Sequence, residues 1–279
     1  MLGYARTDAP TALEPYSLKS GADDMAQLMA RVLIASPNKR FILGGHDWGG
    51  FFVWRFILYY PYLVTGVFSV CTPYSAPREM YLPLEAITTY MPTFKYQLQL
   101  ASGKVDTEVV TKEQIRGFVN TMYGGRTAEG VAPFSTDNGI DFDLLLKTEQ
   151  SPLLSDEELD YYVEEFSRHS ASPLTGPLNW YRTTKIKWEE ELPLAQAKIG
   201  SVEKKIATLS LMIKAKRDVA LPPSMSVGME NFFEELTVRE VDTSHWALVE
   251  DPKGVNGFIG EFVEGVLERE GRGKVKAAI

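Results

Sequence analysis

The chain has 279 residues, of which 44% are hydrophobic and 24% are charged, a composition within the range of ordinary globular proteins. Its net charge of -8 argues against a general nucleic-acid-binding protein, because binding to a phosphate backbone needs a concentrated basic surface. The longest apolar run, residues 51–60, is interrupted by Arg55 and is too short to span a bilayer, so no membrane span is predicted.

The first part of the chain alternates helical and strand patterns. Residues 20–35 carry apolar side chains at helical spacing, and the run RFILGG at 40–45 is typical of a buried strand that enters a tight turn. A second helix is predicted at about 49–60, followed by a buried strand at 63–73. The only cysteine, Cys71, falls in this strand and is interpreted as a packed residue rather than a reactive thiol. A lone cysteine and the lack of a signal region make the cytoplasm the default location.

The pattern changes after residue 75. As far as about residue 200 it shows Pro-rich connectors and short aromatic-bearing helices with no clear buried strand, which indicates an inserted helical region. Beyond that region we predict a strand at 207–215, a helix near 223–235, a strand at 236–242 and a final helix near 254–269. Strands that alternate with helices predict an α/β fold with a mostly parallel sheet. The predicted domains are two parts of one core, 1–74 and 205–279, and a helical cap at 75–204.

Polar residues follow the predicted strands, where active groups of parallel sheets are found. Gly45-His46-Asp47-Trp48-Gly49 has the arrangement of a strand-to-helix elbow with aspartate as the nucleophile. A carboxylate suits attack on a saturated carbon, because the ester that forms can be cleaved by water, whereas serine would give an inert ether. The structural alternative is that Asp47 only caps the following helix. The glycines are expected to be needed because larger residues would collide with the adjoining strand and helix.

Three histidines could serve as a base. His46 precedes the nucleophile, so its side chain should point away from the Asp47 carboxylate, and His169 is expected in a solvent-facing loop of the insertion. His245 follows the last strand and completes the chain order nucleophile, acid, histidine. Asp218, after the strand at 207–215, can orient the His245 ring. For His245 and Asp218 the structural alternatives are a hydrogen-bonded histidine at a strand end and a turn residue.

At this point the sequence resembles the soluble epoxide hydrolase family along nearly its whole length. The family motifs occur in order, as GYARTDAP, GGHDWGGFFVW, CTP at 71–73, FKYQLQL, GPLNWYR at 176–182, KRDVALPP and SHW. The resemblance implies an α/β-hydrolase fold with a helical cap. It also implies that Tyr96, in FKYQLQL, and Tyr181, in GPLNWYR, hydrogen-bond the epoxide oxygen, and that the amide of Trp48 contributes to the oxyanion hole.

The resemblance implies a two-step reaction. Asp47 attacks an epoxide carbon while Tyr96 and Tyr181 stabilise the oxygen, and water activated by His245 then cleaves the ester to release a vicinal diol. A small apolar epoxide and water are the expected partners. No metal or other cofactor is expected, since the three histidines lack ligand spacing with carboxylates or thiols. Whether the chain is a monomer or a homodimer stays open.

The N-terminus departs from the family pattern. Family members have several strands and an HGxP-type loop before GYxxTDAP, and no such tripeptide pattern occurs in this sequence. We therefore expect the N-terminal strands to be missing, through an internal start codon in the gene model or in a shortened, inactive relative. Two other functions stay open: a dehalogenase, which uses the same Asp47, His245 and Asp218 but different donors to the leaving group, and a noncatalytic ligand-binding relative.

Overall fold

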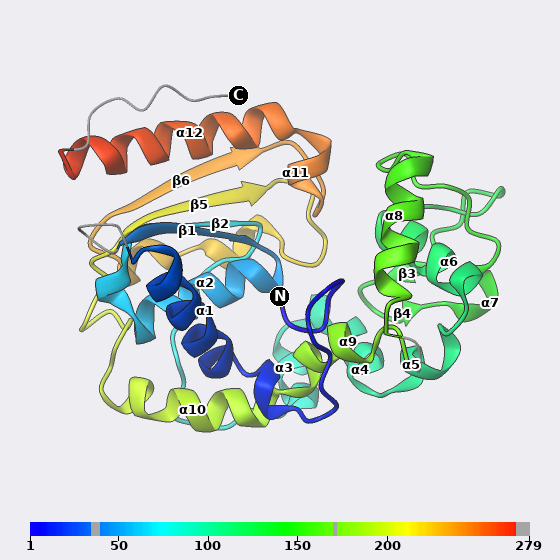
Figure 1. Ribbon diagram of the computed structural model, residues 1–279, viewed down its shortest axis with the longest axis horizontal. Helices are drawn as coiled ribbons and strands as arrows, with labels where there is room; N and C mark the ends of the chain where they lie inside the picture. Colours follow the sequence, from blue (N-terminus) through cyan, green and yellow to red (C-terminus); the bar gives the residue numbers. More distant parts are fainter. Residues whose placement is uncertain (35–39, 170–171, 272–279) are drawn as a thin grey trace. The chain divides into compact units, whose positions relative to one another are not determined.

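The computed structural model describes residues 1–34, 40–169 and 172–271 (Figure 1). The chain divides into two compact units. The sheet unit contains Leu18–Met80 and the chain from Lys187 onward, and the helical unit contains Met1–Ser17 and Tyr81–Ile186. Among the described residues, no helix combines the length and the hydropathy needed to cross a membrane.

The sheet unit is built on four parallel strands in the order β1-β2-β5-β6, as counted in the described residues. The strands are β1 (Phe41–His46), β2 (Val64–Val70), β5 (Leu209–Ala215) and β6 (Leu236–Val241). In register, His46 pairs with Val70, Val70 with Ile213, and Ala215 with Val241. The last residues of all the strands therefore lie along one edge of the sheet, and the loops that follow them start from that edge.

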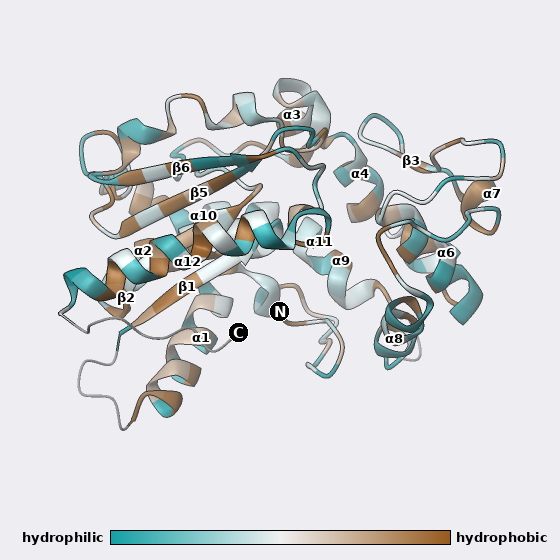
Figure 2. Ribbon diagram, turned by 90° about the horizontal axis from the view of Figure 1, so that it is seen from above, coloured by the Kyte–Doolittle hydropathy of each residue, from teal (hydrophilic) through white to brown (hydrophobic). Residues whose placement is uncertain are grey.

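Burial explains why these segments form strands. The two central strands, β2 and β5, are mostly apolar and almost continuously buried, as expected where both faces of a parallel sheet are covered (Figure 2). The outer strands β1 and β6 are more exposed. Helix α12 (Pro252–Arg269) packs on one face, and α2 (Trp48–Tyr59) packs on β1 and β2 from the other, with α1 (Leu18–Val32) against α2 (Figure 1).

Shorter elements complete the sheet unit. They are η2 (Pro61–Leu63), η4 (Pro223–Ser226), η5 (Met229–Phe232) and α11 (Ala247–Glu250). Helix α10 (Thr184–Gln196) continues into this unit from Lys187. It is joined to α2 by a buried ion pair, in which the Arg55 Nε lies 2.8 Å from Glu191 Oε1. Arg55 also donates to the carbonyl oxygen of Ser75 at 2.8 Å.

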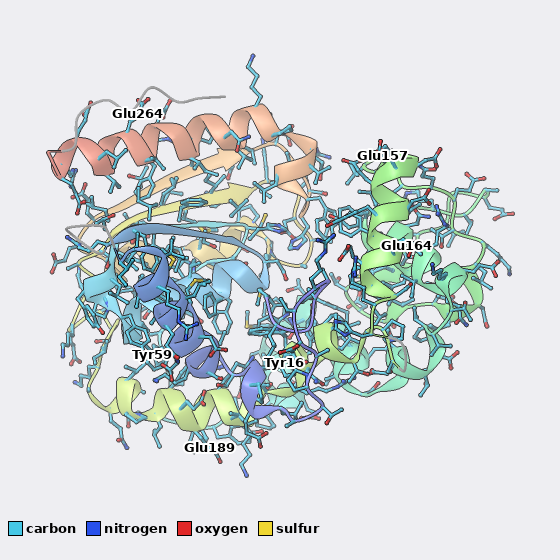
Figure 3. All side chains as sticks on the ribbon, in the orientation of Figure 1. Tyr16, Tyr59, Glu157, Glu164, Glu189 and Glu264 are labelled. Atoms are coloured by element: carbon cyan, nitrogen blue, oxygen red, sulfur yellow. The ribbon has the colours of Figure 1, made fainter. Side chains whose placement is uncertain are left out.

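The helical unit consists of short helices and one small hairpin. Its elements are η1 (Glu14–Tyr16), α3 (Leu84–Tyr90), η3 (Pro92–Phe94), α4 (Tyr96–Ala101), α5 (Lys104–Glu108), α6 (Lys112–Met122), β3 (Phe134–Ser135), β4 (Gly139–Ile140), α7 (Phe142–Leu145), α8 (Asp156–Phe166) and α9 (Thr175–Arg182). Capping boxes start α6, at Thr111 and Gln114, and α8, at Ser155 and Glu158. Glu157 and Glu164 on α8 are exposed and project outward, as does Glu264 on α12 (Figure 3).

The parallel α/β sheet predicted from the sequence is confirmed, and its strands and long helices begin and end within a few residues of the predicted positions. The helix predicted near 223–235 is wrong. Two short 3₁₀ helices, η4 and η5, take its place, because Gly228 between them adopts a φ of +81° that a helix cannot contain. The predicted insertion also contains a strand pair, β3 and β4, which are too short for a pattern of alternating burial to reveal them.

The units also differ from the predicted domains. Residues 1–17 belong with the helices and not with the sheet, because the Trp180 indole donates to the Leu2 carbonyl oxygen at 3.0 Å and Gly3 packs directly on Gly176. At the other end, residues 187–204 belong with the sheet, since α10 is fixed to α2 by the pair of Arg55 and Glu191. The predicted boundaries at 75 and 204 followed composition, which does not register these contacts.

Candidate active site

The elbow predicted around Asp47 forms between β1 and α2. Asp47 adopts φ 53° and ψ −120°, which is unfavourable for a residue with a side chain and is characteristic of functional sites. Its carbonyl oxygen accepts hydrogen bonds from the Phe51 amide at 3.0 Å and from the Thr72 hydroxyl at 2.7 Å. These contacts hold the turn, so that the carboxylate projects from the edge where the strands end.

Three of the four glycines at the elbow leave no room for a side chain, and at Gly44 a Cβ would lie 2.0 Å from the Phe68 ring. A Cβ on Gly45 would lie 2.1 Å from the Gly49 oxygen, and a Cβ on Gly50 would lie 2.4 Å from the Ser69 Oγ. A Cβ on Gly49 would meet nothing within 4 Å. The expectation that the flanking glycines avoid collisions thus holds for Gly45 and is wrong for Gly49. On the helix side of the elbow, the glycine that avoids a collision is Gly50.

The structure brings together the three residues predicted as a triad. His245 Nδ1 lies 2.7 Å from Asp218 Oδ2, and His245 Nε2 lies 3.4 Å from Asp47 Oδ1. The second oxygen of Asp218 accepts the amides of Ala220 and Leu221, both at 2.9 Å. Asp218 is therefore both a turn residue and the orienting partner of the ring, and its side chain is fully buried.

The reading of Asp47 as a simple helix cap is not supported. Asp47 occupies the N-cap position of α2, but its side chain makes no capping hydrogen bond. The carboxylate is a third exposed and faces the His245 ring, and it also accepts the backbone amide of Trp48. The Trp48 amide thus points toward the Asp47 carboxylate.

Charge in the triad is distributed between one cation and two carboxylates. Burial opposes ionisation of Asp47, but the hydrogen bond and the charge of His245 outweigh it and lower the pKa of Asp47 to about 2. Burial also opposes protonation of His245, yet the hydrogen bonds and charges of Asp218 and Asp47 raise its pKa to about 10. The pKa of Asp218 is lowered against its burial by the same histidine. All three pKa shifts therefore favour an imidazolium between two carboxylates.

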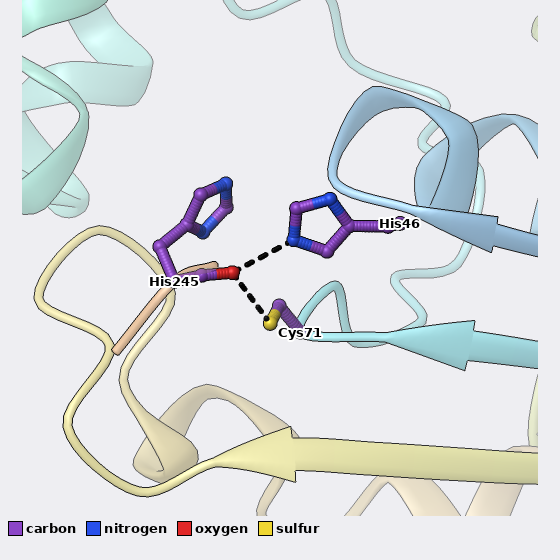
Figure 4. A group of neighbouring side chains, drawn as sticks. All are labelled: His46, Cys71 and His245. Carbon is purple, nitrogen blue, oxygen red and sulfur yellow. Dashed lines mark hydrogen bonds between the residues drawn. The ribbon is translucent and has the colours of Figure 1, made fainter. Parts of the chain in front are cut away.

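A further cluster holds the backbone of His245 (Figure 4). His46 Nε2 lies 2.8 Å from the carbonyl oxygen of His245, and the Cys71 thiol donates to the same oxygen at 3.3 Å. Since a carbonyl oxygen only accepts, the His46 proton must be on Nε2. The pKa of His46 is lowered by burial and by the charge of His245, so this ring is neutral. His46 therefore has an anchoring contact and is not placed as the base.

The same three residues have the composition of a metal site. A ring nitrogen from each histidine and the Cys71 sulfur lie within 4.8 Å of one another, a proximity that sequence spacing did not reveal. Metal binding needs a thiolate, and burial together with the charges of Asp218 and Asp47 raises the pKa of Cys71. With His46 and Cys71 both bonded to a carbonyl oxygen, the arrangement serves hydrogen bonding better than coordination. Cys71 also lies just beyond β2, at φ 67°, rather than within a strand.

The two predicted phenols lie together in the helical unit. Tyr96 is the first residue of α4 and Tyr181 is near the end of α9, and their ring centroids are 6.5 Å apart at an interplanar angle of 72°. Tyr96 is also packed edge-on to Phe134, with centroids 5.4 Å apart. His169, in the same unit, is half-buried rather than solvent-facing, and its Nε2 is covered and has no hydrogen-bond partner among the described residues.

Comparison with known proteins shows the family of the chain. Residues 1–109 match the family model described as the alpha/beta hydrolase fold. The chain is 40% identical over 274 residues to epoxide hydrolase srdG of Neurospora crassa, which covers 96% of this chain and 78% of that protein. The chain belongs to the epoxide hydrolase family. It is also 30% identical to bifunctional epoxide hydrolase 2 of Rattus norvegicus, of which it spans 46%.

Solved structures of other epoxide hydrolases share the fold. Epoxide hydrolase I of potato (Solanum tuberosum) superimposes with a TM-score of 0.74 at 20% identity, covering 95% of this chain and 82% of the potato chain. An epoxide hydrolase from Vigna radiata gives a TM-score of 0.71 at 22% identity, covering 94% of this chain and 80% of that chain.

Sequence reasoning missed the anchoring of His245 by His46 and Cys71. Both residues come directly from strand ends, His46 as the last residue of β1 and Cys71 as the first residue after β2. Because adjacent parallel strands end at the same edge, this placement was a usable signal. The position of the His245 carbonyl between them depends on the loop after β6, which no local pattern predicts.

Proposed function

We propose that the protein is an epoxide hydrolase that converts an epoxide to a vicinal diol through a covalent ester on Asp47. The observation that supports it most directly is a carboxylate on a strained elbow, with His245 Nε2 at 3.4 Å and Asp218 behind the histidine at 2.7 Å. A water molecule in that region would be within reach of the base and of an ester on Asp47. Membership of the epoxide hydrolase family supports the choice of substrate class.

In the first step, an oxygen of the Asp47 carboxylate attacks a ring carbon and the carbon–oxygen bond of the epoxide breaks. The electron pair goes to the ring oxygen, and Tyr96 and Tyr181 donate hydrogen bonds to it before one phenol gives up its proton. Phenols suit this role because their ordinary pKa, near 10, keeps them protonated at neutral pH. The product is a hydroxyalkyl ester of Asp47.

In the second step, water attacks the carbonyl carbon of the ester. Alkylation removes the charge of Asp47, and with it one cause of the raised pKa of His245. The ring can then give up its proton through solvent to the phenolate left by the first step and act as the base, while Asp218 keeps Nδ1 as a donor. The Trp48 amide donates to the oxyanion. Collapse of this intermediate passes the remaining water proton to the leaving alkoxide, releases the diol and regenerates the carboxylate, so the steps balance with water as the only co-substrate.

A single turnover in ¹⁸O-labelled water tests the proposal. With excess enzyme and styrene oxide as a small apolar probe, the ester route predicts unlabelled diol and one ¹⁸O atom in the peptide that contains Asp47, read by mass spectrometry. Direct attack of water on the epoxide would instead label the diol and refute the ester. The Asp47→Asn protein serves as the control that forms no labelled carboxylate.

The triad alone does not separate this reaction from dehalogenation, which uses the same nucleophile, base and acid. Bromide release from a bromoalkane in place of epoxide opening would favour a dehalogenase. Binding of styrene oxide without any turnover would favour a noncatalytic ligand-binding protein. Loss of epoxide turnover in Tyr181→Phe, by about a hundredfold or more as for an oxyanion donor, is expected only of the epoxide hydrolase.

A further inference from the structure

Helix α9, which carries Tyr181, is fastened at both ends to one carboxylate. The hydroxyl of Thr175, the first residue of α9, donates to Asp106 Oδ1 at 2.6 Å. Arg182, the last residue, donates through Nη1 to the same oxygen at 3.2 Å and through Nη2 to Oδ2. The Asp106 side chain, on α5, is 12% exposed and that of Arg182 is 15% exposed. A bidentate pair this well shielded fixes orientation more firmly than an exposed ion pair does.

Arg182 also contacts the helix that carries the other phenol. Its Nε donates at 3.1 Å to the carbonyl oxygen of Ala101, the last residue of α4, and Tyr96 is the first residue of α4. Its Nη1 donates to Asn179 Oδ1 at 2.9 Å, one turn back on α9. One guanidinium thus connects α9, α5 and the C-terminal end of α4. It uses the planar set of five N–H donors that only arginine has.

Helix α9 is also held by residues near the N-terminus of the chain. The Trp180 indole donates to the Leu2 carbonyl oxygen at 3.0 Å, and the Asn179 amide donates to the Pro10 carbonyl oxygen at 3.4 Å. Loss of the Arg182 contacts would therefore leave the helix attached, but free to shift along α4. Tyr181 precedes Arg182 directly in the chain, so such a shift of α9 would change the separation of the two phenols.

We propose that Arg182 is a positioning residue, whose guanidinium, held by Asp106, sets the separation of the Tyr96 and Tyr181 phenols. This inference rests on the proposed function, in which both phenols hold the same ring oxygen. A displacement of about 1 Å in such a pair costs on the order of a hundredfold in rate. Arg182 itself touches neither phenol oxygen in this scheme and acts through the position of its helix.

The position of Arg182 predicts an effect on one step only. Alkylation of Asp47 uses the phenols, whereas attack of water on the ester uses His245. We expect Arg182→Met to slow alkylation by about 10- to 100-fold and to leave ester hydrolysis within about twofold of wild type. Asp106→Asn should act in the same direction, and Arg182→Lys should recover part of the loss because one donor can still reach Asp106.

A double-mutant cycle distinguishes positioning from general stabilisation. Alkylation is measured by rapid mixing with excess styrene oxide and quenching, followed by mass spectrometry of the Asp47 ester, in wild type, Arg182→Met, Tyr181→Phe and the double variant. If Arg182 acts through Tyr181, Arg182→Met should cost less than about threefold in the Tyr181→Phe background. Arg116→Met, which removes an exposed arginine paired with Asp160 in the same unit, is the matched control and should leave the rate unchanged.

Each result of the double-mutant cycle supports or overturns a specific claim. If the losses of the two single variants multiply in the double variant, or if both steps slow equally in Arg182→Met, the positioning role is overturned while the proposed function stands. If wild type forms no ester on Asp47, the proposed function fails and the inference fails with it. Should Arg182→Met not fold, as judged by its melting transition, the same cycle is run with Arg182→Lys, where coupling to Tyr181→Phe is again expected.

Discussion

His245 is held between two carboxylates, and the two have different functions in the proposed reaction. Asp218 is buried and keeps its contact throughout, while Asp47 is lost as a charged partner when it becomes an ester. Both carboxylates raise the pKa of His245, which reaches about 10 in the resting site. The raised pKa favours a protonated histidine before substrate binds, and in the proposed reaction the ring becomes a better base only after the first step.

Replacing Asp47 with asparagine imitates this loss of charge. We expect the pKa of His245 in Asp47→Asn to fall below the wild-type value of about 10, because one hydrogen bond to a charged acceptor and one negative charge are removed. Turnover should fall at least about 1,000-fold, since the nucleophile is gone. NMR titration of the His245 ring protons measures the first effect.

The control for this titration is Asp242→Asn. Asp242 follows β6 and its side chain is 75% exposed beside Arg217, so its removal should leave the titration of His245 unchanged. An unaltered His245 titration in Asp47→Asn would show that the two side chains are not coupled, and the charge argument for the second step would be lost.

His46 holds the backbone of His245, the proposed base, through a hydrogen bond to its carbonyl oxygen. His46→Ala removes the 2.8 Å donor to the His245 carbonyl oxygen and leaves only the longer thiol contact. We expect ester hydrolysis to slow about tenfold and the free energy of unfolding to fall by about 1–2 kcal/mol, as for a buried acceptor that loses a donor. Alkylation should be nearly unaffected, because it does not use His245.

His46→Gln provides the comparison for that experiment, measured by the same rapid-quench assay and by urea unfolding. The amide of glutamine can place an N–H donor near the position of Nε2, so this variant should recover most of the hydrolysis rate. Equal loss in the glutamine and alanine proteins would indicate that ring packing on His245, and not the hydrogen bond, is what matters.

At the scale of elements, the tight approach of α2 to β2 depends on Gly50. A Cβ there would lie 2.4 Å from Ser69 Oγ and 2.9 Å from Thr72 Cβ, and both neighbours are buried. We expect Gly50→Ala to lower the free energy of unfolding by about 1–3 kcal/mol through overpacking. Gly49→Ala is the matched control in the same helix turn. With open space around its Cβ, it should be neutral or stabilising by up to about 1 kcal/mol.

Urea unfolding of both glycine variants gives the comparison directly. Because Thr72 also donates to the Asp47 carbonyl oxygen, Gly50→Ala should disturb the elbow and lower turnover as well. A Gly50→Ala protein as stable as Gly49→Ala would mean that α2 can move away from β2 at little cost.

The elements that could be predicted are those with a strong local pattern. The central strands are mostly apolar runs, and Asp47, Asp218 and His245 each follow a strand, so the topology of a parallel sheet was enough to bring them together. What could not be predicted depended on tertiary contacts. The attachment of residues 1–17 to α9 rests on backbone carbonyl groups of Leu2 and Pro10, which have no signature in the sequence.

At the scale of the whole molecule, the site makes stability depend on pH in two directions. His245 holds its proton more tightly in the folded state, where its pKa is about 10, than its ordinary value of 6.5. Its stabilisation is fully present below pH 6.5 and is lost as the pH rises toward 10. Asp47, whose pKa is lowered from 3.8 to about 2, contributes above pH 3.8 and loses its contribution as the pH falls toward 2.

These two pH ranges predict how the difference in the free energy of unfolding between wild type and His245→Gln depends on pH. The free energy of unfolding of wild type minus that of His245→Gln should be largest between about pH 4 and 6.5, where the imidazolium and both carboxylates are charged. It should decrease steadily from pH 6.5 to 10, and again below pH 4. Urea unfolding of both proteins across this range measures it, and subtracting the variant removes the titration of groups elsewhere. A difference that grows as the pH rises above 6.5 would mean that His245 is neutral in the resting protein. Asp47 would then have no cationic partner, and the charge arrangement from which the second step was argued would be wrong.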